Sequence, residues 1–229
     1  TTMKILAALL TPTSGKAWIA GEDVSANPAR IRQLVGYMPD FFGVYDDLKV
    51  DEYLDFYAAS YGISVRERRM IIGDLLELVD LSHKRQAYVD SLSRGMKQRL
   101  CLARSLVHDP ALLILDEPAS GLDPRARVEM RELLKELKSM GKTIIISSHI
   151  LPELAELCTH IAIMEAGRLV VSGTNQEIVE HTRTGRTLQI RVMDQADAAA
   201  LILHEELRLT EVFFINNSLE LPFNGSDEE

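Results

Sequence analysis

Short apolar runs alternate along this chain with segments of helical periodicity. Three runs are rich in Val, Ile and Leu, at Gln33–Met38, Leu112–Leu115 and Thr143–Ser147. Continuous apolar runs of this length indicate strands that are buried on both faces, as in a parallel sheet covered by helices. The pattern therefore predicts an α/β fold with a parallel sheet core.

Helical spacing of apolar residues predicts helices at Thr1–Leu10, Arg125–Ser139 and Pro152–Cys158. Ahead of the first parallel strand, Lys16–Ala20 has the pattern of a strand, and the turn-forming residues 21–23 follow it. These residues predict an antiparallel β edge at the N-terminal side of the core.

The segment Val50–Val107 carries helical periodicity throughout, with breaks near Gly62 and near His83. Two breaks predict three helices in this segment. Because they interrupt the alternation of strands and helices, we expect an α-helical subdomain inserted into the sheet core.

Beyond the core, Ile161–Met164 and Arg168–Val171 predict a hairpin, because a short turn-forming stretch separates them. A further strand at Thr187–Val192 and a helix at Ala196–Glu206 follow. We expect the polar, acidic end, Leu221–Glu229, to be frayed.

These patterns divide the chain into four parts. Residues 1–40 begin the core, 41–108 form the α-helical subdomain, 109–180 complete the core, and 181–229 form an appendix to which the sequence assigns no role.

The composition is 46% hydrophobic and 26% charged, with a net charge of −9. An acidic chain without a broad basic stripe argues against a nucleic-acid partner. Apolar runs are far shorter than the roughly 18 residues of a membrane span, and no export leader begins the chain. Cys101 and Cys158 form no CxxC and read as buried small side chains. These features predict a cytosolic protein.

The strand Leu112–Leu115 ends in two adjacent carboxylates, Asp116 and Glu117, followed by Pro118. Parallel sheets open their ligand crevice at the carboxyl ends of their strands. One carboxylate there can hold a magnesium ion through water, and the other can face an attacking water. The alternative is a pair that only caps the following turn.

Ser93-Arg94-Gly95 begins a predicted helix, where a hydroxyl, a glycine and free N–H groups make an anion site. The alternative is an ordinary serine cap. A local basic cluster lies beside this proposed phosphate site and comprises Arg94, Lys97, Arg99 and Arg104. His149 follows the strand next to the acidic pair, where it could contact a terminal phosphate. The alternative is a structural histidine.

Together, these motifs resemble the nucleotide-binding domain of an ABC transporter over roughly residues 1–175. Leu92–Arg99 resembles the family signature, Leu112–Glu117 the Walker B strand, Ser120–Asp123 the D-loop and His149 the switch histidine. The resemblance implies a P-loop NTPase fold, with ATP and Mg²⁺ as cofactors.

The resemblance also implies a mechanism. Two such domains pair head to tail around two ATP molecules. Asp116 would hold magnesium, Glu117 would polarise the water, and His149 would come from the same subunit. Ser93 and Gly95 of the other subunit would contact the γ-phosphate. Catalysis would be mainly positioning and charge stabilisation.

Thr1 resembles the magnesium-binding hydroxyl that ends a phosphate-binding loop, and Thr2 would also contact nucleotide. The alternative for Thr1 is a plain helix cap. Asp123 would link the two sites across the dimer. Asp40 stands where the family has the Q-loop glutamine and would bind metal and nucleotide, unless it only caps the loop after Pro39.

The amino-acid sequences of the signature and of the loop Tyr37–Phe42 resemble those of ATPases that serve ABC-2-type permeases, many of them exporters. Partners would be a second nucleotide-binding domain and an integral membrane permease, which the aromatic loop Phe41–Tyr45 would contact. The protein would then be peripheral, on the cytoplasmic face of the membrane.

The glycine loop and lysine ahead of Thr1 are not in this sequence. We expect a fragment truncated within this loop, which would itself be inactive. Arg94 and Met96 replace the commoner Gly and Gln of the signature. Two alternatives remain open: a soluble ABC-type ATPase without a permease, and a non-catalytic cassette that acts as an interaction module.

Overall fold

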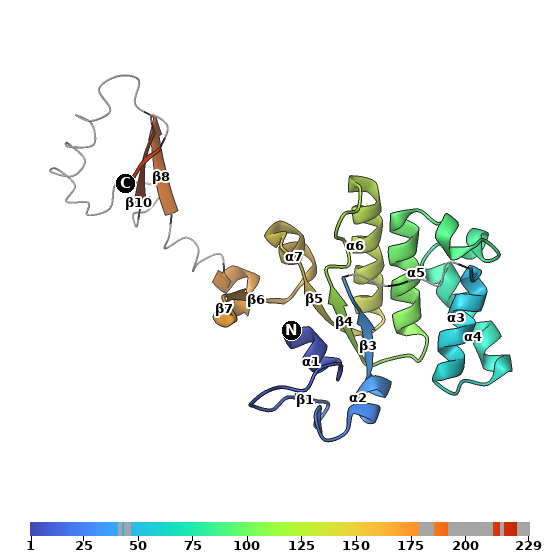
Figure 1. Cartoon of the computed structure of the whole chain (residues 1–229). Helices are drawn as coiled ribbons and strands as arrows, with labels where there is room; N and C mark the ends of the chain where they lie inside the picture. The colour runs from blue at the N-terminus through green and yellow to red at the C-terminus, as the bar shows by residue number, and fades with distance from the viewer. Residues whose placement is uncertain (41–42, 44–46, 179–185, 192–212, 216–217, 224–229) are drawn as a thin grey trace. The chain divides into compact units, whose positions relative to one another are not determined.

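The computed structural model describes residues 1–40, 43, 47–178, 186–191, 213–215 and 218–223. The chain divides into two compact units, Thr1–Glu153 and Leu154–Glu229, and each is described by itself (Figure 1). All candidate site residues belong to the first unit. The four-part division predicted from the sequence stays a prediction.

A three-stranded parallel sheet forms the centre of the first unit. It comprises β3 (Val35–Met38), β4 (Leu112–Asp116) and β5 (Thr143–Ser147), in the order β3-β4-β5. Leu113, Ile114 and Leu115 of the central strand are fully buried, as their uninterrupted apolar sequence requires. The predicted parallel core is confirmed.

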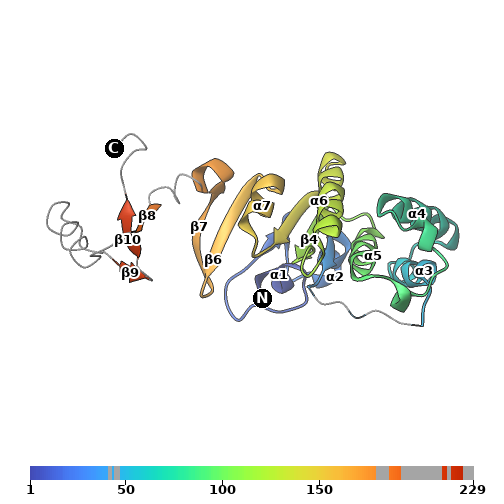
Figure 2. The same cartoon turned by 90° about the horizontal axis from the view of Figure 1, so that it is seen from above.

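Helices cover both faces of this sheet (Figures 1 and 2). One face carries α6 (Pro124–Ser139), whose buried residues include Met130 and Leu134. On the other face, α1 (Thr2–Leu6) and α2 (Pro28–Leu34) pack against one buried cluster. Ile31 of α2 is buried in this cluster, and Met3 and Leu6 of α1 are partly buried against it. That cluster comprises Ala7, Ile19, Val24, Ile31, Val35 and Ile114.

The N-terminal segment differs from the prediction in detail. α1 ends at Leu6 rather than Leu10, because Ala8 adopts a left-handed φ of 54° that stops the helix. The expected antiparallel edge is present as β1 (Trp18–Ile19) and β2 (Glu22–Asp23). The turn lies at Ala20 and Gly21 rather than at residues 21–23, so Glu22 and Asp23 pair in the second strand.

The sequence interpretation missed α2. Asn27 caps this helix by accepting a hydrogen bond from the N–H of Arg30 at 3.4 Å, and Pro28 occupies the first turn. An Asn cap followed by proline is a recognised helix start. Because α2 runs to Leu34, β3 begins at Val35, later than expected.

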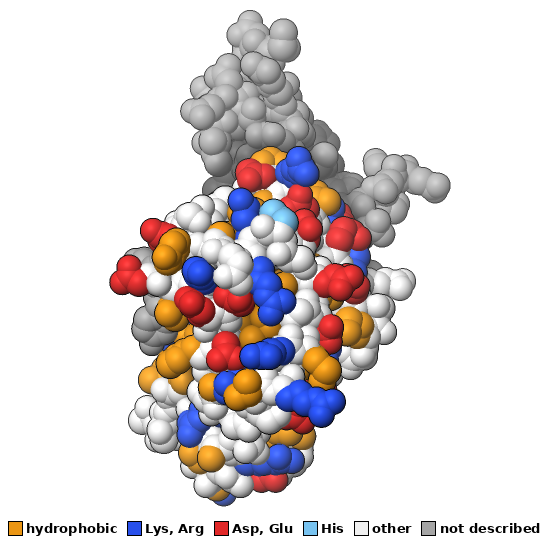
Figure 3. Space-filling model, turned by 90° about the vertical axis from the view of Figure 1, so that its right-hand side faces the viewer, with side chains coloured by type: hydrophobic (Ala, Val, Ile, Leu, Met, Phe, Trp, Pro, Cys, Tyr) orange, Lys and Arg blue, Asp and Glu red, His pale blue; other side chains and the backbone are white. Residues whose placement is uncertain are grey.

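The α-helical block contains the three predicted helices, α3 (Val50–Ser60), α4 (Val65–Leu78) and α5 (Arg94–Leu106). Gly62, at a φ of 75°, closes the first break, and two short 3₁₀ turns occupy the second (Ser82–Lys84 and Val89–Ser91). Figure 3 shows this side of the molecule, where basic and acidic side chains are interspersed with hydrophobic ones.

In the second unit, β6 (His160–Glu165) and β7 (Arg168–Thr174) form the predicted hairpin. Its turn contains Ala166 and Gly167, both with positive φ, which suits a tight hairpin connection. The helix α7 (Leu151–Leu157) precedes it and spans the boundary between the units.

A separate antiparallel sheet has the order β8-β10-β9, from β8 (Arg186–Arg191), β9 (Phe213–Ile215) and β10 (Ser218–Phe223). The strand predicted at 187–192 is thus confirmed over 187–191. Leu221–Phe223 pair with β8, which corrects the expectation of a frayed end from Leu221. The helix expected at 196–206 lies outside the described residues. Within the described part of the chain, no helix combines the length and apolar character that a membrane span requires.

Candidate functional site

The carboxyl ends of β4 and β5 bring an acidic pair next to a serine. The parallel register places Asp116 opposite Ser147. The Ser147 hydroxyl donates to Oδ1 of Asp116 at 2.7 Å and accepts from the N–H of Glu117 at 3.0 Å. One hydroxyl therefore fixes both the Asp116 carboxylate and the backbone of Glu117. Ser147 ends the strand beside the acidic pair, but no role was predicted for it from the sequence.

Glu117 and His149 are in direct contact. Nδ1 of His149 lies 3.0 Å from Oε2 and 3.1 Å from Oε1 of Glu117. The Glu117 side chain is 25% exposed and that of His149 is 71% exposed. The structure thus brings His149 next to the acidic pair, Asp116 and Glu117, which the sequence indicated as a separate motif. We name Asp116, Glu117, Ser147 and His149 the acidic edge.

Glu117 has an unusual backbone, with a left-handed φ of 51°. This conformation is costly for a residue with a Cβ, and such residues persist where surrounding contacts over-determine them. The hydrogen bond from its N–H to Ser147 is one such contact. The reversal at Glu117 ends the strand and turns its carboxylate toward His149.

Asp40 follows β3, and its charge reaches the same neighbourhood through Tyr37. Burial, and then the negative charges of Asp116 and Asp40, raise the pKa of Tyr37. The phenol oxygen of Tyr37 is also buried without a hydrogen-bond partner. Two carboxylates and an unpartnered phenol therefore lie at this edge of the sheet. A cation or a water molecule bound there would give the phenol oxygen the partner that it lacks.

The donor set fits a magnesium ion that is shared with a ligand. Among the described residues, no three His, Cys, Asp or Glu side chains are arranged to hold a metal by themselves. Magnesium in phosphate-transfer sites takes one or two carboxylates and completes its shell with phosphate oxygens and water. Asp116, fixed by Ser147, could be such a carboxylate.

The serine helix start, Ser93 to Gly95, lies at the beginning of α5. The Ser93 hydroxyl accepts from the N–H of Met96 at 3.3 Å, so the ordinary capping role is present. The helix start can still bind an anion while Ser93 caps it, because the first turn of a helix has several N–H groups without helical partners. A Cβ at residue 95 would lie 3.1 Å from Cβ of Ala126, so the glycine allows α5 to approach α6 closely.

Asp123 caps α6, accepting a hydrogen bond at Oδ1 from the N–H of Ala126 at 3.0 Å. This capping role was not foreseen from the sequence, although Asp-Pro at a helix start is a known signal. This hydrogen bond does not test the prediction that Asp123 links the two nucleotide sites of a dimer.

Thr1 precedes α1, and its side chain makes no capping hydrogen bond to the helix. Thr1 and Thr2 are both exposed. The loop at 41–45, expected to contact a permease, lies outside the described residues except for Gly43.

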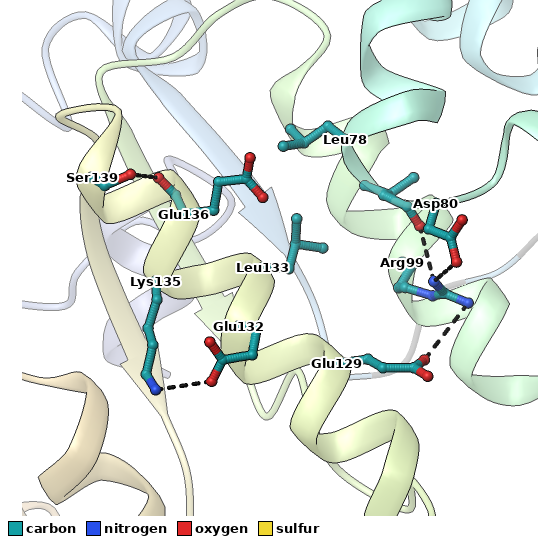
Figure 4. A pocket seen from close by; sticks show the side chains of 10 residues that line it. Leu78, Asp80, Arg99, Glu129, Glu132, Leu133, Lys135, Glu136 and Ser139 are labelled. Atoms are coloured by element: carbon teal, nitrogen blue, oxygen red, sulfur yellow. Dashed lines mark hydrogen bonds and ion pairs between the residues drawn. The ribbon is translucent and has the colours of Figure 1, made fainter.

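Two arginines of α5 that were expected beside a phosphate site have other partners. Arg99, only 14% exposed, donates to the carbonyl of Val79 at 3.2 Å and to Asp80 at 3.3 Å. It also lies 3.9 Å from Glu129 of α6 (Figure 4). Arg99 therefore holds the end of α4 and α6 together rather than facing a ligand at the helix start.

Arg104 is also turned away from the helix start, into the α-helical block. Its Nη1 lies 3.2 Å from the Tyr53 hydroxyl, and its guanidinium lies over the Tyr57 ring, 5.1 Å from the centroid. A cation over an aromatic face is favourable when it is desolvated. Arg94, another member of the expected basic cluster, contacts the loop that follows the acidic edge, as described below.

The cavity beside Arg99, of about 640 Å³, contains none of the predicted site residues (Figure 4). Its lining residues come from the end of α4, from α5 and from α6: Leu78, Val79, Asp80, Arg99, Glu129, Glu132, Leu133, Lys135, Glu136 and Ser139.

Relatives of this chain are exporter subunits by name. The Nod factor export ATP-binding protein I of Burkholderia orbicola (strain AU 1054) is 41% identical over 180 residues, which cover 79% of this chain and 59% of that protein. The protein of the same name from Rhizobium sp. (strain N33) is 38% identical over 180 residues. The chain thus spans less than two thirds of these relatives.

Among solved structures, an ATP binding subunit of an ABC transporter matches with a TM-score of 0.69 and 30% identity, covering 79% of this chain and 75% of that one. CbiO1 from Clostridium perfringens, part of the cbiONQ complex, has a TM-score of 0.68 at 24% identity, covering 90% and 79%, which shows the fold alone. The expected P-loop NTPase-type fold is confirmed.

The family model described as "ABC transporter" matches residues 1–120. This match covers more than half of the chain's 229 residues, and it includes the serine helix start and both carboxylates of the acidic edge. The chain therefore belongs to the ABC transporter family.

Proposed function

We propose that this chain belongs to an ATP-hydrolysing subunit that powers a membrane permease, of the ABC-2 type and acting in export. Membership of the family and the export names of its relatives support this proposal. The subunit would be peripheral, on the cytoplasmic face of the membrane, with the permease and a second nucleotide-binding domain as partners.

Within the acidic edge, Asp116 would hold the magnesium ion, and Ser147 keeps the Asp116 carboxylate in place. Glu117 orients and polarises the attacking water. His149, in contact with Glu117, reaches the terminal phosphate. Magnesium supplies charge neutralisation at the phosphates, and the side chains contribute by position and charge.

The serine helix start acts on a different ATP, held by a second copy. Ser93 and the N–H groups near Gly95 bind its γ-phosphate, as helix starts bind anions. Asp123 links the two sites. Thr1 would supply its hydroxyl to magnesium, Thr2 would contact the nucleotide, and Asp40 would contact the nucleotide and its metal.

The observation that carries the proposal is the contact between Glu117 and His149 at 3.0 Å, beside an Asp116 that Ser147 holds. A carboxylate that is only partly exposed and lies next to an imidazole is suited to hold a water for attack. A pair that only capped the next turn would not need the histidine.

The experiment uses the natural protein that contains these residues, with Glu117→Gln as the test variant and Glu132→Gln as the control. Glu132 is an exposed glutamate of α6 that pairs with Lys135. We expect phosphate release to fall at least ~100-fold in the first variant, because general-base positioning is lost. Gel filtration with Mg-ATP should also show that variant as a dimer, since it binds ATP without consuming it.

A Glu117→Gln protein that stays monomeric with Mg-ATP would contradict the proposal, as would one that hydrolyses ATP at the rate of the control. Purification from membranes separates the remaining alternatives. Hydrolysis without a copurifying integral membrane protein would indicate a soluble ATPase, and a membrane partner without ATP binding would indicate an interaction module.

A further inference from the structure

Arg94 joins the serine helix start to the loop that follows the acidic edge. Its Nη2 donates to the carbonyl of Ser120 at 3.1 Å. Its guanidinium also lies against Gly121, so closely that a Cβ on residue 121 would overlap it. Gly121 has a φ of 65°, so the loop itself also favours glycine there. The Arg94 guanidinium thus donates a hydrogen bond to Ser120 and packs against the next residue, Gly121.

The same loop is bonded to Glu117. The N–H of Ser120 donates to the carbonyl of Glu117 at 3.0 Å. Two consecutive hydrogen bonds therefore run from the Arg94 guanidinium through the Ser120 residue to the backbone of Glu117. Because Glu117 adopts a left-handed φ, its position depends on such contacts.

We propose that Arg94 is a positioning residue that acts through Ser120 on Glu117 of its own chain. The inference rests on the proposed function, in which Glu117 serves the ATP of its own copy and Ser93 serves the ATP of the facing copy. Arg94 then couples the two sites within one chain, because it ties the start of α5 to the loop that supports Glu117.

The chemistry of the side chain favours arginine at this position. A guanidinium is planar, so it can donate to a carbonyl while one face packs on a glycine Cα. A lysine could donate to Ser120 but has no flat face for Gly121. We therefore expect Arg94→Lys to retain part of the effect and Arg94→Gly to lose it.

The first experiment measures steady-state hydrolysis by the natural protein. Arg94→Gly should lower kcat about fivefold to tenfold, the typical net effect of one hydrogen bond, with little change in KM for ATP. Arg94→Lys should lie between. Arg125→Ala is the control, because Arg125 is 90% exposed and pairs only with Glu129 among the contacts that the structure gives it. Hydrogen exchange of residues 119–122 should rise in Arg94→Gly and not in the control.

The second experiment asks which site Arg94 serves, by mixing Arg94→Gly with Glu117→Gln. In a mixed dimer, the only active Glu117 comes from the chain that lacks Arg94, whereas its ATP faces an intact Arg94 of the other chain. We expect the mixture to stay slow. Recovery toward about a quarter of the wild-type rate, as random pairing would give, would overturn the inference and assign Arg94 to the facing phosphate.

Unchanged kcat and unchanged exchange in Arg94→Gly would also overturn the inference while leaving the proposed function intact. Failure of the unaltered protein to bind or hydrolyse ATP would overturn the proposed function and the inference together. Thermal unfolding of each variant shows whether a fall in rate reflects loss of the fold.

Discussion

The acidic edge and the serine helix start are built in opposite ways. At the acidic edge, Ser147 of β5 hydrogen-bonds to both Asp116 and Glu117 at the end of β4, and Glu117 contacts His149 within the same chain. At the helix start, Ser93 is exposed and makes one capping bond, and its neighbour Arg94 points back to the loop before α6. The side chains of the first region are held by contacts within one chain, whereas the second region leaves N–H groups of a helix start without helical partners.

This difference indicates where each region acts. Preorganised groups stabilise a transition state best when they need no rearrangement, which fits an acidic edge that already holds its carboxylates. A helix start with unpaired N–H groups attracts an anion from outside. The first region would therefore act on nucleotide bound to its own chain, and the second on nucleotide bound to a second copy.

The largest expected effect comes from mixing two inactive variants. Ser93→Asp keeps a good helix cap but places a negative charge beside the phosphate, so it should lose at least ~100-fold in rate, as should Glu117→Gln. In a mixed dimer, one site contains neither substitution. We expect phosphate release to recover to about a quarter of the wild-type rate.

Each variant alone, at the same total concentration, is the control for this mixture. A mixture no faster than its components would mean that Ser93 and Glu117 act in the same site, and the comparison between the two regions would fail. Rescue of Ser93→Asp but not of Arg94→Gly by the same partner would separate the two residues cleanly.

The next effect concerns Ser147, for which the sequence predicted no role. Ser147→Ala removes the donor to Asp116 and the acceptor for Glu117, so we expect kcat to fall about tenfold and stability to fall by about 1–2 kcal/mol. Ser148→Ala is the matched control, since the Ser148 hydroxyl only accepts from the N–H of Ile150 among its described contacts. Equal kcat values in the two variants would contradict the role of Ser147.

A smaller effect separates the two roles of Asp123. Asp123→Ala should destabilise the protein by about 1 kcal/mol, because α6 loses its cap, whereas Asp123→Asn keeps a capping oxygen. Urea unfolding measures this difference. If Asp123 also links the two sites, Asp123→Asn should hydrolyse ATP more slowly despite normal stability. Normal hydrolysis in Asp123→Asn would leave only the capping role.

Elements of the fold were predictable where one principle dominated. The three parallel strands and the three helices of the α-helical block follow from periodicity, which burial enforces along each element. The length of α1 was overestimated because Ala8, in a left-handed conformation, ends the helix, and an alanine in the sequence does not indicate that conformation. α2 was missed although Asn27 and Pro28 signal it, because its seven residues carry little periodicity.

The candidate site was predictable in its residue types but not in its connections. Adjacent carboxylates at a strand end and a histidine after the next strand locate the acidic edge. The bonds through Ser147 depend on the register of β4 and β5, which a single sequence does not specify. For the same reason, the sequence could not show that Arg94 contacts Ser120 or that Arg99 and Arg104 turn elsewhere.

The smallest expected effect is a pH dependence of stability that arises far from either region. His108 stacks on Tyr61, with ring centroids 3.9 Å apart, and its Nε2 lies 3.2 Å from the carbonyl of Val35. Burial lowers the pKa of His108, and the positive charge of Lys142 lowers it further. The hydrogen bond to the carbonyl of Val35 and the negative charge of Asp109 act in the opposite direction but are outweighed.

Because the pKa of His108 is lower in the folded state, the unfolded chain takes up the proton first. The stabilisation by a neutral His108 is therefore present above the ordinary histidine pKa of about 6.5 and decreases as pH falls below it, by up to about 1.4 kcal/mol per unit of pKa difference. His108→Gln should flatten the fall in unfolding free energy between about pH 7.5 and pH 5.5. Parallel pH profiles for His108→Gln and wild type would show that His108 does not titrate on unfolding. Phosphate release at pH 7.5 should be the same in both, since neither region of the comparison contains His108.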